Sequence, residues 1–459
     1  MRVFFTNLGC KLNQAELERL ARRFDAAGHR VVGTVGEADL HVVNSCTVTH
    51  QAARTSRKTA RRGGRAHPGL KTVLTGCWAT DSPAEAARLA GVDLVIDNAD
   101  KERLLERVHQ AFPELAAGAE PRSAALTGGA AALPTDVPYV PLAFGNTRAL
   151  VKVEDGCSMR CAFCIIPSTR GRQRSRPLAE VVAEVASMAA AGVREVVVTG
   201  VQISHYRDGA ARLHELVRAL VERTAVPRLR LTSIAPWCFD RRHFDLWAAG
   251  DGRLCRHVHM SLQSGCDATL ERMRRPYTAA AYRGLVEEIR AAVPGVAVTT
   301  DVIVGFPGES DEEFAASLAF VEALGFARVH AFPYSARRGT EAAEMPGQVP
   351  HAAKRGRMAA LLAVAAAAER GFRAANVGGV AQVLWEERRG GGWAGTADNY
   401  LRVFAEGGGE ADLLGRLTAA RITGLASDGV VAEALPHSTR NFAASSSRPR
   451  SASADAANR

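Results

Sequence analysis

Three cysteines lie close together near the middle of the 459-residue chain. Cys157, Cys161 and Cys164 have C-x3-C-x2-C spacing, and the next histidine and cysteine, His205 and Cys238, come much later. A structural zinc site has four protein ligands, whereas iron–sulfur clusters are bound by cysteine thiolates. With three thiolates, one iron keeps an open position, as catalytic metal sites do. The spacing therefore predicts an iron–sulfur cluster. A zinc loop completed by a distant ligand, or three simply buried cysteines, are the alternatives.

Three other cysteines, called the first set because they come first in the chain, are far apart in sequence but share one context. The loop of Cys157, Cys161 and Cys164 is called the second set. Cys10, Cys46 and Cys77 each come just after an apolar segment of strand type, namely "RVFFT", "DLHVVN" and "KTVLTG". The carboxyl ends of parallel strands meet at one edge of a sheet, where ligands bind. We therefore expect these cysteines to converge on a second metal centre, although single free cysteines are often merely buried. The remaining cysteines are interpreted as non-ligands: Cys238, Cys255 and Cys266.

The elements that position these cysteines predict an α/β protein. Strands and helices alternate over residues 1–112, which predicts an N-terminal parallel α/β sheet domain. Residues 113–146 are rich in Ala, Gly and Pro and are typical of a linker. Six further strand–helix units over residues 147–375 predict a partial (β/α)6 barrel, with its chemistry at the carboxyl ends of the strands.

The last part of the chain differs in composition and in the pattern of its apolar residues. Short glycine-separated strands over residues 376–437 predict a small all-β module. Residues 438–459 are rich in Ser, Ala and Arg, and we expect a disordered basic tail. The longest apolar run, residues 358–368, is too short to span a bilayer and is interpreted as a buried helix. We therefore expect a cytoplasmic protein without a membrane partner.

The chain is basic, with 58 Lys and Arg against 48 Asp and Glu, a formal net charge of +10 and a pI near 9.4. This balance favours a polyanionic partner, nucleic acid above all. A codon bias toward arginine is the alternative. Nine cysteines in a cytosolic chain indicate metal or redox chemistry rather than disulfides.

The cysteine loop "CSMRCAFC" resembles the signature of the radical S-adenosylmethionine (SAM) family, with Phe163 before the third cysteine. The resemblance implies that the amino and carboxylate groups of SAM chelate the open iron, and that reductive cleavage releases a 5′-deoxyadenosyl radical. Polar segments at the strand ends then correspond to SAM contacts. Gln202, Ala235 and Cys266 depart from the residues that many relatives have at these positions. The residues expected to bind SAM are Phe163, Thr199, Gly200, Gln202, Ser233, Gln263 and Asp301.

Three N-terminal segments, "NLGCKLNQAE", "VNSCTVT" and "TGCWA", resemble the first domain of the methylthiotransferases. That family joins this domain to a radical SAM barrel and a small β module called TRAM. The resemblance implies two [4Fe-4S] clusters, one on each cysteine set, and an electron donor as a partner. The cluster on the N-terminal set would hold the sulfur that is methylated by a second SAM and inserted at an unactivated C–H bond.

Within the family, "NLGCKLNQAE" and "RMRRPYT" are similar to the branch that acts on C2 of N6-threonylcarbamoyladenosine at position 37 of tRNA. The branch for isopentenyladenosine typically has tyrosine before its first Gly-Cys pair. The branch for a ribosomal protein typically has proline where this chain has Lys11. These two substrates remain alternatives, as does a non-catalytic RNA-binding metalloprotein.

Two basic segments are candidates for contacts with tRNA phosphates. Residues 50–71 contain seven Lys or Arg and no acid, and residues 169–177 contain four arginines. The alternative is a solvated helix face with local ion pairs. In the β module, exposed aromatic residues could stack on unpaired bases. The predicted RNA-binding residues are Arg170, Arg172, Arg176, Tyr400 and Arg402.

Overall fold

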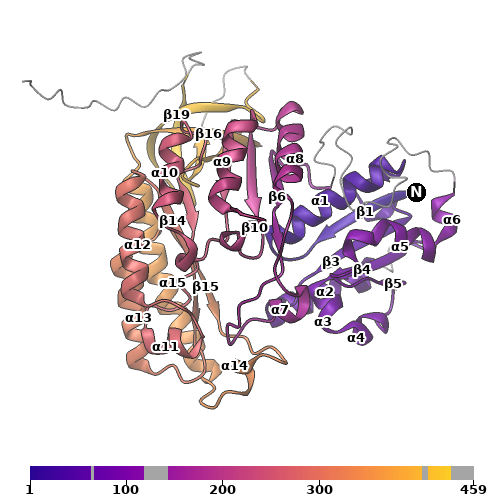
Figure 1. The fold of residues 1–459 in the computed structure, drawn as a ribbon, viewed down its shortest axis with the longest axis horizontal. Coiled ribbons are helices and arrows are strands. Elements are labelled where there is room, and N and C mark those ends of the chain that lie inside the picture. The colour runs from indigo at the N-terminus through magenta and orange to yellow at the C-terminus, as the bar shows by residue number, and fades with distance from the viewer. Residues whose placement is uncertain (64–66, 118–142, 406–411, 436–459) are drawn as a thin grey trace, which may run out of the picture.

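The computed structural model describes residues 1–63, 67–117, 143–405 and 412–435. Figure 1 shows an N-terminal α/β body (indigo), a larger α/β body (magenta to orange) and a small β-barrel (yellow). The predicted α/β class is therefore confirmed. The expected tail, residues 438–459, lies outside the described residues, as do residues 118–142 of the expected linker.

The N-terminal body is built on a five-stranded parallel sheet of order β2-β1-β3-β4-β5. Helices α1 and α5 pack on one face through an apolar cluster that includes Leu17, Phe24 and Leu104. Helices α2, α3 and α4 cover the other face through a cluster that includes Ala53 and Trp78. The elements are β1 (Arg2–Asn7), α1 (Lys11–Ala26), β2 (Arg30–Val31), η1 (Val35–Glu37), β3 (Leu40–Ser45), α2 (His50–Gly63), β4 (Lys71–Gly76), α3 (Cys77–Asp81), α4 (Pro83–Ala87), β5 (Leu94–Val95), η2 (Lys101–Arg103), α5 (Leu104–Ala111) and α6 (Pro113–Ala116).

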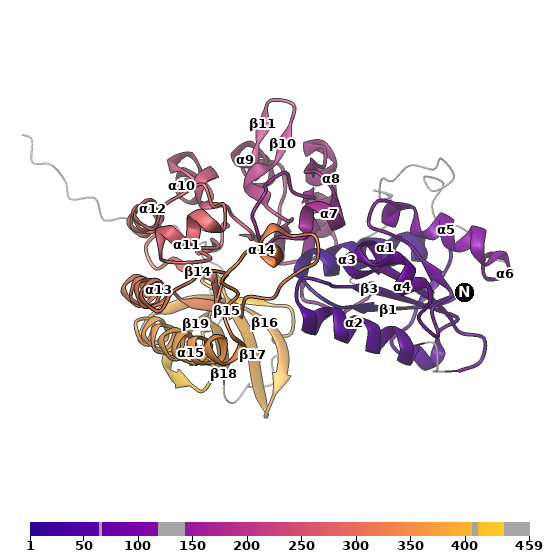
Figure 2. The same cartoon turned by 90° about the horizontal axis from the view of Figure 1, so that it is seen from below.

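The larger body contains the six expected parallel strands. They form two three-stranded sheets, β12-β9-β6 and β13-β14-β15, which isolated bridges such as Ile234–Met260 connect. Helices cover the outer face (Figure 2). The strands are β6 (Arg148–Lys152), β9 (Glu195–Thr199), β12 (Arg228–Leu231), β13 (His257–His259), β14 (Ala297–Val304) and β15 (Arg328–Pro333), and short hairpin strands are β7 (Glu154–Asp155), β8 (Arg174–Ser175), β10 (Arg207–Asp208) and β11 (Ala211–Arg212). The helices are α7 (Ile166–Arg170), α8 (Leu178–Ala190), η4 (Ile203–His205), α9 (Leu213–Arg223), η5 (Pro236–Cys238), α10 (Arg241–Ala249), α11 (Asp267–Arg272), α12 (Ala279–Ala292), α13 (Asp311–Leu324), α14 (Glu341–Glu344) and α15 (His351–Ala374).

The two α/β bodies meet through helix α1. Ala15 of α1 forms a small buried cluster with Leu150 of β6 and Val197 of β9. The neighbouring residues on these strands, Val151 and Val196, point the other way into the cluster beneath the outer helices. Because side chains alternate along a strand, α1 packs against the inner face of the partial barrel. The N-terminal body therefore contacts the partial barrel on the inner face of β6 and β9.

The C-terminal β module is a closed five-stranded barrel of order β16-β17-β18-β20-β19. Strand β17 was not anticipated, because its sequence "GWAGTA" is poor in residues that favour strands. Trp385 and Trp393 are buried in the core of the barrel. The strands are β16 (Val380–Arg389), β17 (Gly392–Ala397), β18 (Arg402–Ala405), β19 (Leu417–Ala426) and β20 (Gly429–Ala434).

The apolar run at residues 358–368 is not a buried helix, contrary to expectation. It lies within α15, where Leu361 and Ala365 are buried but the side chain of Leu362 is 51% exposed. Alanine has the highest helix propensity, so an alanine-rich helix can lie on the surface with one narrow apolar stripe. Across the described residues, none of the helices combines the length and apolarity needed to cross a membrane.

Candidate active site

Cys10, Cys46 and Cys77 converge at the carboxyl edge of the N-terminal sheet. They follow β1, β3 and β4, which pair side by side in parallel. Burial, together with the nearby thiols of Cys77 and Cys10, raises the pKa of the Cys46 thiol to about 11. Gly9 has φ +133°, and a Cβ at this position would lie 3.0 Å from Cys46 Cβ and 3.2 Å from its Sγ. The glycine therefore makes room for the close approach of Cys10 and Cys46.

Cys157, Cys161 and Cys164 form a compact loop after β7. The backbone N–H of Cys157 donates to the carbonyl of Gly171, and that of Cys164 donates to the carbonyl of Cys161. Burial raises the pKa of the Cys164 thiol, and the neighbouring thiols of Cys161 and Cys157 add to that rise. Arg275, which we did not predict, donates from Nη1 to Cys161 Sγ at 3.3 Å. The loop thus holds three thiols together with a cation beside one of them.

Both sets consist of cysteines alone, which suits an iron–sulfur cluster. In the described part of the chain, no three His, Cys, Asp or Glu side chains are arranged to hold one metal ion. A cluster has several irons, so its thiolates need not converge on one point, whereas a structural zinc ion needs four converging ligands. The arrangement therefore fits clusters better than the zinc alternative.

Four of the expected SAM contacts lie beside the second cysteine loop. Thr199 ends β9, Gly200 and Gln202 come after it, and Ser233 follows β12 with φ +57°. The side chain of Gln202 accepts from Cys157 Sγ at 3.7 Å through Oε1. Its backbone N–H donates to Oε2 of Glu154 at 2.9 Å. These four residues therefore share one edge of the barrel with the cysteine loop.

Glu154 was not singled out in the sequence, because a lone glutamate at the end of an apolar strand carries no distinctive signal. Burial raises the pKa of this carboxyl to about 8. A Cβ at Gly200 would lie 2.8 Å from Glu154 Oε2, so the glycine is needed for this approach. Oε1 is buried and has no hydrogen-bond partner among the described residues. The carboxyl therefore has an unused polar atom next to the second cysteine loop.

A cavity of about 230 Å³ is lined by Cys164 of the barrel loop and by Val48 and Thr49 of the N-terminal body. The barrel contributes three further expected residues, Phe163, Gln263 and Asp301, together with Cys164. Asp301 accepts hydrogen bonds from Ser261 Oγ at 2.7 Å and from His259 Nε2 at 3.1 Å, which fixes its carboxylate. The remaining wall residues were not predicted and include Val48, Thr49, Phe332, Tyr334 and Ser335.

Both α/β bodies contribute residues to the wall of this cavity. Val48 and Thr49 follow Cys46 by two and three residues, and Phe332 is the penultimate residue of β15. Val48 and Phe332 are among the exposed large apolar residues, and 40% of Phe332 is accessible. Exposed apolar side chains around a cavity are typical of a ligand site. The cavity is therefore walled by residues of both bodies and reaches Cys164 of the barrel loop.

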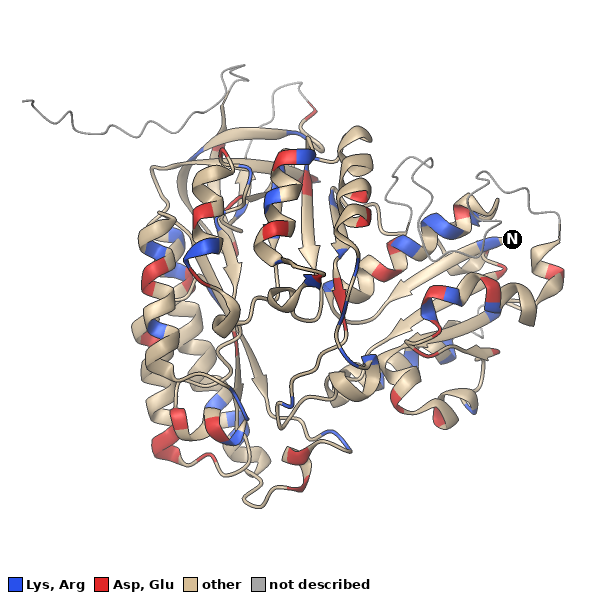
Figure 3. Cartoon of the chain, in the orientation of Figure 1, with Lys and Arg blue, Asp and Glu red and all other residues tan. Residues whose placement is uncertain are grey.

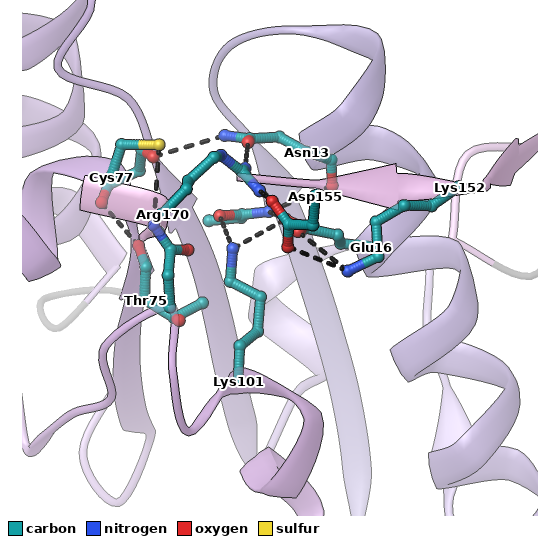
Figure 4. A network of polar contacts seen from close by, with 12 residues as sticks. Asn13, Glu16, Thr75, Cys77, Lys101, Lys152, Asp155 and Arg170 are labelled. Carbon is teal, nitrogen blue, oxygen red and sulfur yellow. Dashed lines mark hydrogen bonds and ion pairs between the residues drawn. The ribbon is translucent and has the colours of Figure 1, made fainter. Parts of the chain in front are cut away.

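Arg170 is not available to RNA, contrary to its prediction. It is 3% exposed, and Nη1 donates to Glu16 Oε1 and to Asp155 Oδ1, each at 2.8 Å. Lys101 and Lys152 also pair with Glu16, at 2.7 and 3.3 Å (Figure 4). A buried arginine needs such partners. Arg170 therefore links the barrel to α1 rather than to a phosphate.

Tyr400 and Arg176 are partly exposed and also contact other protein groups. The Tyr400 ring stacks on His257 at a centroid distance of 4.5 Å, and its hydroxyl accepts from Lys11 Nζ at 3.1 Å. Arg176 pairs with Glu184 at 2.6 Å and donates to the carbonyl of Lys152. Contact of these two side chains with RNA therefore stays a prediction.

Arg172 and Arg402 remain candidates for RNA contacts. Both are exposed. Arg402 pairs with the exposed Glu387 and lies over the Phe404 ring. An exposed ion pair of this kind is weak, so a phosphate can replace the carboxylate.

Comparison with known proteins gives two family matches. The model "Radical SAM superfamily" matches residues 151–321, and the model "Uncharacterized protein family UPF0004" matches residues 2–97. A solved structure of the radical SAM methyltransferase TsrM from Kitasatospora setae has a TM-score of 0.55 at 19% identity and covers 74% of this chain and 75% of that chain. At this identity the likeness concerns the fold alone.

Curated relatives are similar over most of their length. The threonylcarbamoyladenosine tRNA methylthiotransferase MtaB of Bacillus subtilis is 34% identical, covering 92% of this chain and 93% of the relative. The tRNA-2-methylthio-N(6)-dimethylallyladenosine synthase of Cereibacter sphaeroides is also 34% identical, covering 92% of this chain and 96% of the relative. With a radical SAM barrel, two cysteine triads and relatives at this identity and coverage, the chain belongs to the radical SAM tRNA methylthiotransferases, enzymes that use SAM and two [4Fe-4S] clusters.

Proposed function

We propose that this enzyme methylthiolates C2 of N6-threonylcarbamoyladenosine at position 37 of tRNA. The cavity carries the proposal: it is lined by Cys164 and by Val48 and Thr49, which follow Cys46 closely in sequence, so one nucleobase there would lie near both cysteine sets. The choice of substrate rests on the MtaB relatives, which include those of Bacillus subtilis and Aquifex aeolicus at 34% identity. Segments "NLGCKLNQAE" and "RMRRPYT" favour the same branch.

The residues of the chain have separate roles in this proposal. Cys157, Cys161 and Cys164 would hold one cluster, and Cys10, Cys46 and Cys77 the other. When bound, the two clusters and SAM supply a 5′-deoxyadenosyl radical and the sulfur to be transferred. The N-terminal domain (1–112) would thus carry the sulfur, the barrel (147–375) the radical chemistry, and the β module (376–437) part of the tRNA contact.

The cavity residues would bind and shield the reactants. The apolar side chains of Phe163, Val48 and Phe332 would exclude water, which protects a reactive radical from side reactions. Glu154 is protonated at neutral pH because burial raises its pKa to about 8. Its free Oε1, with Thr199, Gly200, Gln202, Ser233, Gln263 and Asp301, would orient SAM. We also infer a cytoplasmic location, where tRNA and an electron donor are present.

Nucleoside mass spectrometry of tRNA from cells that lack the gene tests the substrate. We expect the methylthio derivative of threonylcarbamoyladenosine to disappear and the unmethylthiolated nucleoside to accumulate. An unchanged level of the derivative would contradict the proposal. Loss of the methylthio derivative of dimethylallyladenosine instead would assign the chain to the branch of the Cereibacter relatives.

A further inference from the structure

Helix α2 carries a row of cations on its outer face. Its buried positions, Ala53, Ser56, Ala60 and Gly63, pack toward the sheet. The cations are spaced three and four residues apart, so they share the opposite face of the helix. Like all Lys and Arg of the described chain, they are coloured blue in Figure 3, and they line a groove of about 470 Å³: Arg54, Arg57, Lys58, Arg61 and Arg62.

These charges are poorly compensated by the protein itself. Helix α2 contains no acidic residue. Of the five, Arg57 alone has an acidic partner among the described residues, Glu85 at 3.8 Å. Like charges four residues apart, such as Arg54 and Lys58, destabilise an isolated helix by about 0.2–0.5 kcal/mol per pair. A solvated helix face would gain from mixed charges, so this face is suited to a polyanion.

The position of α2 ties this face to the active-site cavity. Helix α2 begins at His50, immediately after the cavity residues Val48 and Thr49. The backbone N–H of His50 donates to Oγ of Ser335, another cavity residue, at 3.3 Å. Arg54 lies four residues further, about 6 Å along the helix axis. The cationic groove therefore begins about one helical turn from the cavity.

We propose that the outer face of α2 binds the phosphates of the tRNA strand next to the nucleotide that enters the cavity. This inference rests on the proposed function, because it takes tRNA as the substrate. Arginine and lysine side chains supply sequence-independent contacts to phosphates, which set the position of a nucleic acid on a protein. The groove would thereby place the target adenosine at the cavity without reading its base.

The test compares two triple variants that lose the same charge. The test variant is Arg54→Gln/Lys58→Gln/Arg61→Gln, and the control variant, at exposed positions on α9 and α15, is Arg218→Gln/Arg355→Gln/Arg370→Gln. Binding of tRNA to each cluster-loaded protein is measured over a series of salt concentrations. We expect the test variant to bind at least about tenfold more weakly at low salt, with a salt dependence of log Kd reduced by about two. Equal affinity and equal salt dependence for the two variants would overturn the proposal.

Further measurements separate the possible failures. The charge-preserving variant Arg54→Lys/Arg61→Lys should bind tRNA as the wild type does, and the circular dichroism and iron content of all variants should match. If the wild type does not bind tRNA, the proposed function itself fails, and this inference fails with it. If the test variant loses binding to anionic lipid vesicles but keeps full affinity for tRNA, the groove serves a membrane surface and the proposal is wrong.

Discussion

Arg170 and Glu16 form a buried ion pair across the two α/β bodies, with Nη1 of Arg170 2.8 Å from Oε1 of Glu16. Arg170 ends α7, six residues after Cys164, and Glu16 lies on α1, six residues after Cys10. Nη2 of Arg170 also donates to Asn13, whose amide nitrogen donates to the carbonyls of Leu8 and Ser45 beside the first cysteine set. The pair therefore fixes the two cysteine sets relative to each other.

Replacing Arg170 with Met should destabilise the protein strongly. Removing one partner of a buried ion pair leaves the other charge buried with less compensation and lowers the free energy of unfolding by about 3–5 kcal/mol. Chemical denaturation with urea measures this change. The exposed neighbour Arg172 provides the control, and Arg172→Met should change the free energy of unfolding by less than about 0.5 kcal/mol. Equal effects of the two substitutions would contradict the role assigned to Arg170.

Gly9→Ala should impair the first cluster site alone. The substitution adds a Cβ 3.0 Å from Cys46 Cβ at a φ of +133°, where an L side chain is strained. We expect reconstituted protein to hold one cluster equivalent instead of two, measured by iron analysis and Mössbauer spectroscopy. In the control Gly36→Ala, the new Cβ would have no atom within 4 Å. Two full cluster equivalents in Gly9→Ala would show that Gly9 is not needed for the approach of Cys10 and Cys46.

Phe332→Ala should weaken catalysis with little effect on stability. The ring lines the cavity and is 40% exposed, so its removal leaves little buried apolar surface uncovered. Stacking of a base on an aromatic ring contributes about 1–3 kcal/mol, which predicts a fall in kcat/KM for tRNA of about tenfold. Leu362→Ala, at another exposed apolar residue on α15, should leave kcat/KM unchanged. The prediction fails if the two variants have the same kcat/KM.

Acid should destabilise the N-terminal body through His41. Burial lowers the pKa of this histidine from 6.5 to about 4, so the unfolded chain takes up a proton that the folded chain excludes. The contribution of His41 to stability is therefore complete above pH 6.5 and declines as the pH falls toward 4, by about 2 kcal/mol between pH 7 and pH 5. Unfolding of His41→Gln should depend less steeply on pH in this window, whereas the exposed His351→Gln should follow the wild type. Identical pH profiles for all three proteins would show that His41 does not titrate as proposed.

The elements could be predicted from the sequence where the pattern is local. All six barrel strands have apolar runs followed by polar turns, and each cysteine of the first set directly follows such a run. Strand β2 has only two residues, too few to form a pattern. Short strands of this kind are recognised only through their pairing partners.

The errors at the site come from contacts between distant parts of the chain. Arg170 is a basic residue in a basic segment, which suggested RNA. Its partner Glu16 lies more than 150 residues away in sequence, and no local pattern reveals such a pair. Arg275 and Glu154 were missed for the same reason, since each acquires its role only beside the folded cysteine loop.

The central claim is tested most directly with the purified enzyme. Anaerobically reconstituted protein is incubated with SAM, a reductant and tRNA that carries threonylcarbamoyladenosine, and the nucleosides are analysed by mass spectrometry. We expect the methylthio derivative of threonylcarbamoyladenosine to form with the wild type and not with Cys157→Ala/Cys161→Ala/Cys164→Ala. No methylthiolated product, or a product on dimethylallyladenosine tRNA alone, would contradict it.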